Sequence, residues 1–167
     1  MKTWKSEVFE WGIALMLGIA IIWLIRTTFL TTYHIQGDSM LPNLHSNDKV
    51  VVLRNTTIDY GDIVILHRSQ DSDIVKRVIG LPGDKIEFKE NAIYINGEYQ
   101  EETYIVSESF TLKDSEVVVP EDSYFVLGDN RDRSLDSRQL GEFRSSQIVG
   151  EVKMIYFPLG HLQWISY

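Results

Sequence analysis

The sequence of 167 residues contains no cysteine. This absence excludes disulfide bonds, a cysteine nucleophile and any metal site built from thiolates. It does not assign a redox compartment, because a chain without thiols is tolerated in either environment. The length suffices for one domain and an appended segment.

Basic residues are also in short supply. The chain carries 16 lysines and arginines against 24 aspartates and glutamates, for a net charge of −8. The first 30 residues hold three basic and two acidic residues, so the remainder carries about −9. A surface of this sign repels phosphate backbones, which argues against a nucleic-acid partner and is otherwise typical of solubility.

Signatures of metal and cofactor chemistry are missing. The four histidines, at positions 34, 45, 67 and 161, show no paired spacing such as H-x-x-x-H, so no metal site is predicted. The chain has no Gly-x-Ser-x-Gly turn and no glycine loop that would hold a phosphate, and no cofactor is expected. A Ser-His-Asp triad stays open, because its members need not be close in sequence.

One long run, Trp11 to Ile25, consists only of apolar residues and glycines. Its flanks extend it towards the ~20 residues that a membrane span needs, provided that Arg26 reaches the interface. The run has no polar face, unlike a core helix. No Ala-x-Ala pattern follows it, unlike a cleaved signal peptide. We therefore predict one uncleaved transmembrane anchor over residues 8–30.

Lys2 and Lys5 precede this run. The positive-inside rule then places residues 1–7 in the cytoplasm and residues 31–167 outside the membrane. The sequence predicts a single-pass protein of the cell membrane whose main domain is extracellular.

After residue 30 the hydrophobic pattern becomes short and alternating, rich in β-branched and aromatic residues. Asn96-Gly97 is a strong hairpin signal, because both positions of a type I′ turn need a positive φ. The predicted fold is mostly β, an antiparallel sheet or barrel-like domain, with residues 100–116 as a polar, acidic loop or insertion. The expected strands are 49–53, 63–66, 74–79, 85–88, 92–95, 117–119, 124–127 and 149–157.

Ser39 lies between Gly37 and Pro42, about a dozen residues beyond the predicted anchor. Glycine permits close backbone approach and proline stiffens the exit, so the hydroxyl is a candidate nucleophile near the membrane. The alternative is an ordinary serine in a turn.

Lys76 shares one face of a predicted strand with Ile74 and Val78, while Val75 and Arg77 face the other way. A lysine buried among apolar neighbours has a lowered pKa and becomes a candidate general base, which a serine nucleophile needs. The alternative is that the side chain extends to solvent or pairs with Asp73.

Asp, Asn, Arg and Ser are dense in the segment 127–138. The segment lacks the residue order and closing glutamate of a calcium loop. Two interpretations remain: a solvated loop, or a hydrogen-bonded network that builds the wall of a site.

Together these segments resemble the bacterial type I signal peptidases, peptidase family S26, in the short single-span form of Gram-positive species. The likeness covers nearly the whole chain, in order: the anchor, GDSMLPNL, YGDIVIL, VKRVIGLPGDKI and LGDNRDRSLDSRQLG. Each motif alone is only suggestive, whereas their order and spacing are specific.

The resemblance implies a serine endopeptidase with a Ser/Lys dyad, in which Ser39 is the acylating nucleophile and Lys76 the general base. Ser134 would orient the lysine, and the Ser39 backbone N–H would stabilise the oxyanion. The residues implied to support the site are Gly128, Asp129, Asn130, Arg131, Asp136 and Arg138.

Three positions depart from the family pattern. Gly37 replaces the serine that serves Gram-negative members as a second oxyanion donor, and it fits the Gram-positive form. Asn43 and Arg133 stand where the family usually has threonine and asparagine. Gly37 leaves out that side-chain donor, whereas the changes at Asn43 and Arg133 remove no group from the implied chemistry.

The resemblance also implies the partners: preprotein signal peptides cut after Ala-x-Ala-like sites, the lipid bilayer and, as a further candidate, the secretion translocon. Nucleic acid is not among them. The candidate pocket residues, for which a role in the core is the alternative, are Ile35, Met40, Leu44, Ile74 and Val75.

Two other functions compete with the peptidase. One is an inactive membrane-anchored homologue that binds signal peptides or a partner, against which Ser39, Lys76 and Ser134 are all retained. The other is a self-cleaving regulator of the LexA-like type, against which the anchor and the lack of a DNA-binding domain argue.

Overall fold

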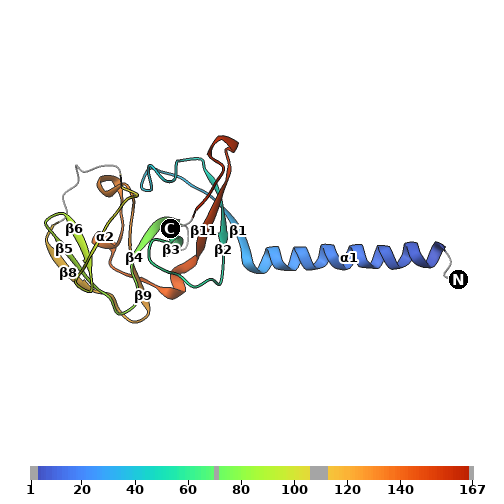
Figure 1. Cartoon of the computed structure of the whole chain (residues 1–167), viewed down its shortest axis with the longest axis horizontal. Helices are drawn as coiled ribbons and strands as arrows, with labels where there is room; N and C mark the ends of the chain where they lie inside the picture. The colour runs from blue at the N-terminus through green and yellow to red at the C-terminus, as the bar shows by residue number, and fades with distance from the viewer. Residues whose placement is uncertain (1–3, 70–71, 106–112, 166–167) are drawn as a thin grey trace.

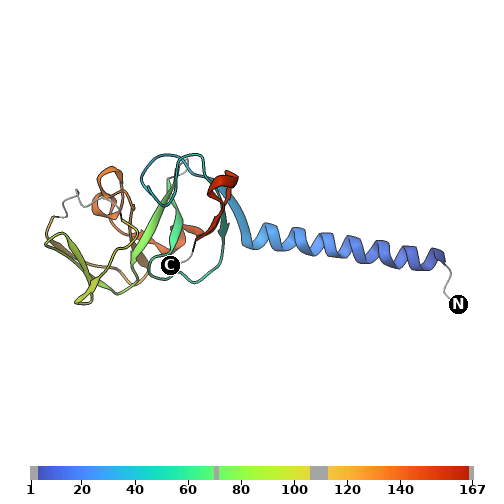
Figure 2. The ribbon, with the colours of Figure 1, turned by 45° about the horizontal axis from the view of Figure 1, so that its top comes forward.

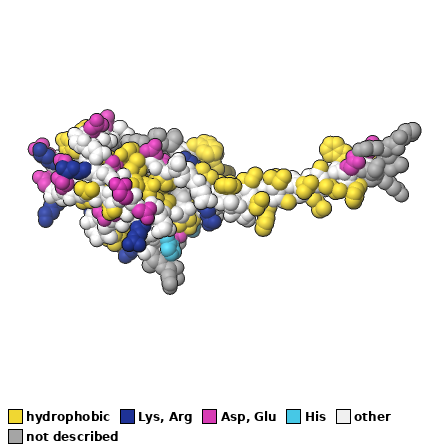
Figure 3. Space-filling view, turned by 90° about the horizontal axis from the view of Figure 1, so that it is seen from below, with side chains coloured by type: hydrophobic (Ala, Val, Ile, Leu, Met, Phe, Trp, Pro, Cys, Tyr) yellow, Lys and Arg dark blue, Asp and Glu magenta, His cyan; other side chains and the backbone are white. Residues whose placement is uncertain are grey.

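A long helix projects from a β domain in this computed structural model, which describes residues 4–69, 72–105 and 113–165 (Figures 1 and 2). The helix, α1 (Trp4–Phe29), contains the segment Phe9–Phe29, which is long and apolar enough to cross a membrane and is not covered by the rest of the chain. Hydrophobic side chains cover most of its length, whereas most charged ones gather on the β domain (Figure 3).

The larger of two sheets follows the helix directly, and its paired strands are antiparallel. Its strands, in spatial order, are β1 (Leu30–His34), β2 (Lys49–Leu53), β11 (Ile148–Phe157), β3 (Ile63–Ser69), β4 (Ser72–Gly80), β9 (Ser123–Leu127) and β10 (Phe143–Arg144), with β12 (Gln163–Trp164) paired to β11.

The smaller sheet lies at the end of the β domain away from α1 (Figure 1). Its strands, in spatial order, are β7 (Glu98–Gln100), β6 (Ala92–Ile95), β5 (Lys85–Lys89) and β8 (Ser115–Val118). Asn96 and Gly97 join β6 to β7 with φ values of 53° and 85°, both left-handed as a type I′ turn requires. The predicted hairpin is therefore confirmed, and so is the mostly antiparallel β fold.

Short helical segments connect the strands. They are the single-turn helix α2 (Ser137–Leu140) and the 3₁₀ turns η1 (Arg131–Arg133), η2 (Ser145–Gln147) and η3 (Leu159–His161).

Strand β4 is buried on both faces from Val75 onward. Its side chains alternate between core clusters: Val75 packs in a cluster that includes Val50 and Val152, whereas Ile74 and Val78 belong to another that includes Val126. This confirms the alternation expected from the sequence. Because neither face is open there, the polar side chains of this part of the strand, Lys76 and Arg77, are removed from water.

The anchor and the loop 100–116 are among the elements whose extent differs from the expectations. Leu30 begins β1 instead of ending the helix, and β1 has an alternating burial pattern that sequence reading missed because the strand adjoins the apolar run. In the predicted loop 100–116, Gln100 ends β7 and Ser115 begins β8. Residues 106–112 of that loop lie outside the described residues.

Candidate active site

Ser39 and Lys76 lie within hydrogen-bond distance of each other. Ser39 is half-buried in the turn that follows β1, and Lys76 lies on β4, opposite Val64 of β3. The Lys76 Nζ atom is 2.7 Å from Ser39 Oγ and donates a second hydrogen bond, of 2.9 Å, to the Val75 carbonyl. The fold thus brings a serine hydroxyl to a lysine amine that is 37 positions away.

The Lys76 amine is poorly solvated, since only 3% of the residue is exposed. Burial lowers its pKa from 10.5 to about 8, while the carboxylates of Asp136 and Asp129 act in the opposite direction. A far larger fraction of this amine is therefore neutral near physiological pH than of a solvated lysine, although the ammonium is still the major form. In the neutral state its lone pair can accept the Ser39 proton.

The carboxylate of Asp136 is fully buried beside this pair. Burial alone would raise its pKa, but hydrogen bonds from the Arg138 guanidinium and the Gly128 backbone N–H hold the pKa below its ordinary value. Arg138 forms a two-point contact with Asp136, at 2.8 and 2.9 Å, and also donates to the Arg131 carbonyl. Asp136 caps α2 as well, which fixes where the loop after β9 ends and the helix begins.

Asp129 forms a second buried ion pair, with Arg77 of β4. The Arg77 guanidinium contacts both carboxylate oxygens, at 2.8 and 2.7 Å, and lies over the Tyr104 ring at 4.1 Å. Asn43 donates to the same carboxylate (2.8 Å) and to the Tyr104 carbonyl (2.9 Å). Arg77, Asn43 and Tyr104 were not predicted as site residues, although a second charged residue directly after Lys76 in the strand was a usable signal.

Asn130 holds the backbone of the serine turn. Its backbone N–H donates to the Ser39 carbonyl (3.0 Å), and its side-chain amide donates to the Asp38 carbonyl (3.0 Å). Arg131, also buried, donates to the Gly128 carbonyl and pairs with Glu102. The loop after β9 therefore fixes the position of Ser39 through main-chain contacts.

The orienting role expected of Ser134 stays a prediction. The resemblance implies a hydrogen bond to Lys76, but in the described residues Ser134 Oγ is buried without a partner in hydrogen-bond geometry, although it lies near enough to Asp136 to help keep the pKa of that carboxyl low. Ser134 packs against Gly128: a Cβ atom at Gly128 would lie 2.1 Å from Ser134 Oγ and 2.6 Å from the Ser39 carbonyl oxygen. The absence of a side chain at Gly128 therefore leaves room for Ser134 Oγ and the Ser39 carbonyl oxygen to pack against the same residue.

A cavity of about 220 Å³ opens beside the pair. Three of the five candidate pocket residues line it, Ile35, Ile74 and Val75, together with Ser39 and Lys76. Met40 and Leu44 are not among the residues that line it. They are buried in the core cluster with Val50, because the turn after Ser39 directs their side chains into the domain.

A possible set of metal ligands lies elsewhere, at His45, Asp48 and His161, whose ligand atoms lie within 4.8 Å of one another. The sequence predicted no metal site. That prediction considered only histidines close together in the sequence. His45 and His161 instead lie near the beginning and the end of the segment that forms the β domain.

Comparison with known proteins places the chain in a family. A model of the family described as signal peptidase, peptidase S26, matches residues 8–157. Signal peptidase I S of Bacillus subtilis is 38% identical, over 95% of this chain and 94% of its own length. Signal peptidase IB of Staphylococcus aureus (strain COL) is 34% identical over the same shares.

A solved structure shows the same relationship. The crystal structure of a signal peptidase I from Enterococcus faecalis V583 aligns with a TM-score of 0.52 and 33% identity, covering 57% of this chain and 97% of that one. The family and the Gram-positive origin of its relatives agree with the motif order in the sequence. This chain belongs to the signal peptidase family of S26 serine peptidases.

Proposed function

We propose that this protein removes N-terminal signal peptides from exported preproteins, with Ser39 as nucleophile and Lys76 as general base. The observation that carries the proposal is the 2.7 Å contact between Ser39 Oγ and the buried Lys76 amine. The names of its relatives, signal peptidase I S and signal peptidase IB, support this substrate class.

The reaction follows from the two side chains. Neutral Lys76 takes the proton of Ser39 as Oγ attacks the carbonyl carbon before the scissile bond. The Ser39 backbone N–H donates to the oxyanion, and Gly37 offers no side-chain donor there. Lys76 then protonates the leaving amine, which frees the mature protein. Finally it takes a proton from water, and the resulting hydroxide releases the signal peptide from the acyl-enzyme.

Ser134 has an orienting role in this scheme. The Lys76 ammonium has three donor positions, of which Ser39 Oγ and the Val75 carbonyl take two. We assign the third to Ser134, whose Oγ is buried without a partner among the described residues. A hydrogen bond from Lys76 would satisfy this oxygen, whose burial without a partner is otherwise unfavourable.

The substrate binds as an extended strand along the first half of β4. Strand β9 pairs with β4 only from Arg77 onward, so in the described residues the segment Asp73–Val75 pairs with β3 alone. The cavity of about 220 Å³ borders this segment, and its apolar wall includes Ile65 and Ile74. We assign this cavity to a substrate side chain next to the cleavage site, of the small type found in Ala-x-Ala sites, because it opens beside Ser39.

Helix α1 anchors the enzyme in the cytoplasmic membrane, with the N-terminus in the cytoplasm and the β domain outside. The length and apolar surface of Phe9–Phe29 and the positive charge before it support this arrangement. Signal peptides and lipid are then its immediate partners, and the secretion translocon is a third.

Replacing either member of the pair removes the activity. Ser39→Ala and Lys76→Ala should each lower kcat/KM for cleavage of a purified preprotein by at least about 10³-fold, because nucleophile and base act as a unit. Lys89→Ala and Ser115→Ala, on the small sheet, are the controls and should cleave at the wild-type rate. Wild-type protein that cleaves no faster than the pair variants would indicate the inactive homologue instead.

The pH dependence follows from the lowered pKa of Lys76. Only the neutral amine accepts the serine proton, so kcat/KM should fall about tenfold per pH unit below an apparent pKa of about 8 and level off above it. A midpoint near ~6.5 would indicate a histidine base, and one near ~10 a solvated lysine. Circular dichroism over the same pH range controls for unfolding.

The residues that line this cavity limit the size of the substrate side chain before the cleavage site. A preprotein with leucine in place of the alanine before the cleavage site should be cut at least about 10²-fold more slowly by the wild type. Ile74→Ala should reduce the difference in cleavage rate between the alanine and leucine substrates, because Ile74 lines the cavity. Ile58→Ala is the matched control: Ile58 packs on the same core cluster as Ile74 but lines a different cavity. Equal effects of both variants would contradict the assignment.

The orientation is tested on intact cells. Protease added to protoplasts should digest the β domain and leave a short anchored fragment, because residues after 30 lie outside the membrane. A cytoplasmic marker protein must survive in the same sample. Protection of the β domain until the protoplasts are lysed would reverse the proposed topology.

A further inference from the structure

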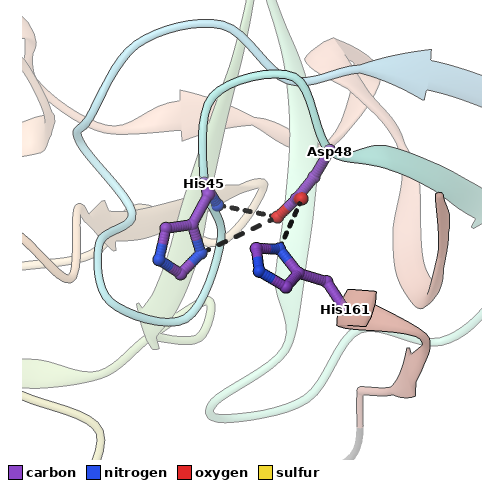
Figure 4. A group of neighbouring side chains, drawn as sticks. All are labelled: His45, Asp48 and His161. Atoms are coloured by element: carbon purple, nitrogen blue, oxygen red, sulfur yellow. Dashed lines mark hydrogen bonds and ion pairs between the residues drawn. The ribbon is translucent and has the colours of Figure 1, made fainter. Parts of the chain in front are cut away.

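Two histidines from distant parts of the chain meet at one buried carboxylate. His45 lies in the loop that follows the Ser39 turn, Asp48 directly precedes β2, and His161 closes η3 near the C-terminus. Figure 4 shows both imidazole rings directed at Asp48. The ring centroids are 5.0 Å apart. The grouping is a product of the fold, since 113 positions separate Asp48 from His161.

Asp48 is held in place independently of the two rings. The residue is only 1% exposed, and its Oδ2 atom accepts a 2.8 Å hydrogen bond from the His45 backbone N–H. Its Oδ1 atom lies 3.2 Å from His161 Nδ1, and Oδ2 lies 4.0 Å from His45 Nδ1. The carboxylate is therefore a fixed acceptor, oriented by a main-chain donor, with two ring nitrogens on its accessible side.

We propose that His45, Asp48 and His161 bind a divalent transition-metal ion of the zinc type. Two imidazole nitrogens and one carboxylate oxygen are a ligand set that zinc takes in proteins, with solvent in the remaining position. One ligand atom from each residue already lies within 4.8 Å of the others. Bonds of about 2.0–2.2 Å require these atoms to approach each other further. Because the side chains of His45 and His161 are about half exposed, at 49% and 46%, rotation of the rings can provide that approach.

The surroundings of the three residues allow an ion to enter. His45 and His161 both line a cavity of about 520 Å³ that also includes Gly160 and Leu162. Solvent in this cavity can complete the coordination shell. An ion bound here would connect the loop after Ser39 to η3, and so hold the C-terminal segment to the part of the domain that carries the nucleophile.

A second imidazole–carboxylate pair provides an internal comparison. His67 Nδ1 lies 2.6 Å from Asp73 Oδ1, a shorter contact than either histidine makes with Asp48. In the described residues, no second histidine joins that pair to form a group of metal ligands. His67→Ala therefore removes an equivalent half-exposed imidazole without touching the proposed site.

The test uses the full-length protein in detergent, purified without a histidine tag and treated with a chelator. Titration with zinc chloride, followed by calorimetry, should show one ion per chain with a Kd in about the micromolar range or below. His45→Ala and His161→Ala should each weaken zinc binding at least about tenfold, because each removes a ligand. His67→Ala should bind as the wild type does. The histidine variants are preferred to a change at Asp48, whose burial makes its loss a risk to folding.

Thermal unfolding gives an independent readout. An ion that binds only the folded chain raises the Tm, so zinc should stabilise the wild type and His67→Ala but not His161→Ala. Cobalt(II) should add visible absorption bands in the same two proteins. The proposal is overturned if the His45 and His161 variants bind zinc like the wild type, or if the wild type binds only at millimolar zinc.

Discussion

The removal of the Lys76 amine from water is the constraint on which the rest of the site depends. A pKa lowered from 10.5 to about 8 corresponds to a cost of about 3 kcal/mol for keeping the ammonium in the folded protein. Lys76 has a lower pKa in the folded protein than in the unfolded chain, so its burial reduces the free energy of unfolding by this whole amount below about pH 8. The reduction becomes smaller as the pH rises from 8 towards 10.5. The β domain tolerates it because β4 is fixed on both faces by apolar packing.

Without their arginine partners, the carboxylates near Lys76 would raise the pKa of the lysine and oppose the effect of burial. Asp136 and Asp129 both raise the pKa of the lysine, yet each is paired with a guanidinium, that of Arg138 and Arg77 respectively. The pairing reduces the field at the amine and satisfies groups that are buried with it. Two ion pairs therefore lie near Ser39 and Lys76 without contacting them. Three of their four residues come from the loop after β9 and the helix that follows it, which explains why this segment is rich in both acidic and basic residues.

Much of the fold and of the candidate site could be predicted from local sequence patterns. The apolar run, the alternating strands and the Asn96-Gly97 turn each carry a signal within a few residues, and the motif order then indicated the family. The rest depends on contacts between distant segments. The histidine pair at Asp48, the Asn43 bond to Asp129 and the burial of Met40 leave no periodic pattern. The side-chain direction of Ser134 depends on packing against Gly128, which residue order does not encode.

Helix α1 passes into β1 without a linker. Phe29 ends the helix, Leu30 begins the strand, and the Arg54 backbone N–H donates to the Phe29 carbonyl at the junction. With α1 in the bilayer as proposed, the sheet begins at the lipid surface, and the turn that carries Ser39 follows its first strand. Under the proposed function, a scissile bond would reach Ser39 only when the stretch between it and the substrate's own membrane segment spans the distance from the lipid to that turn.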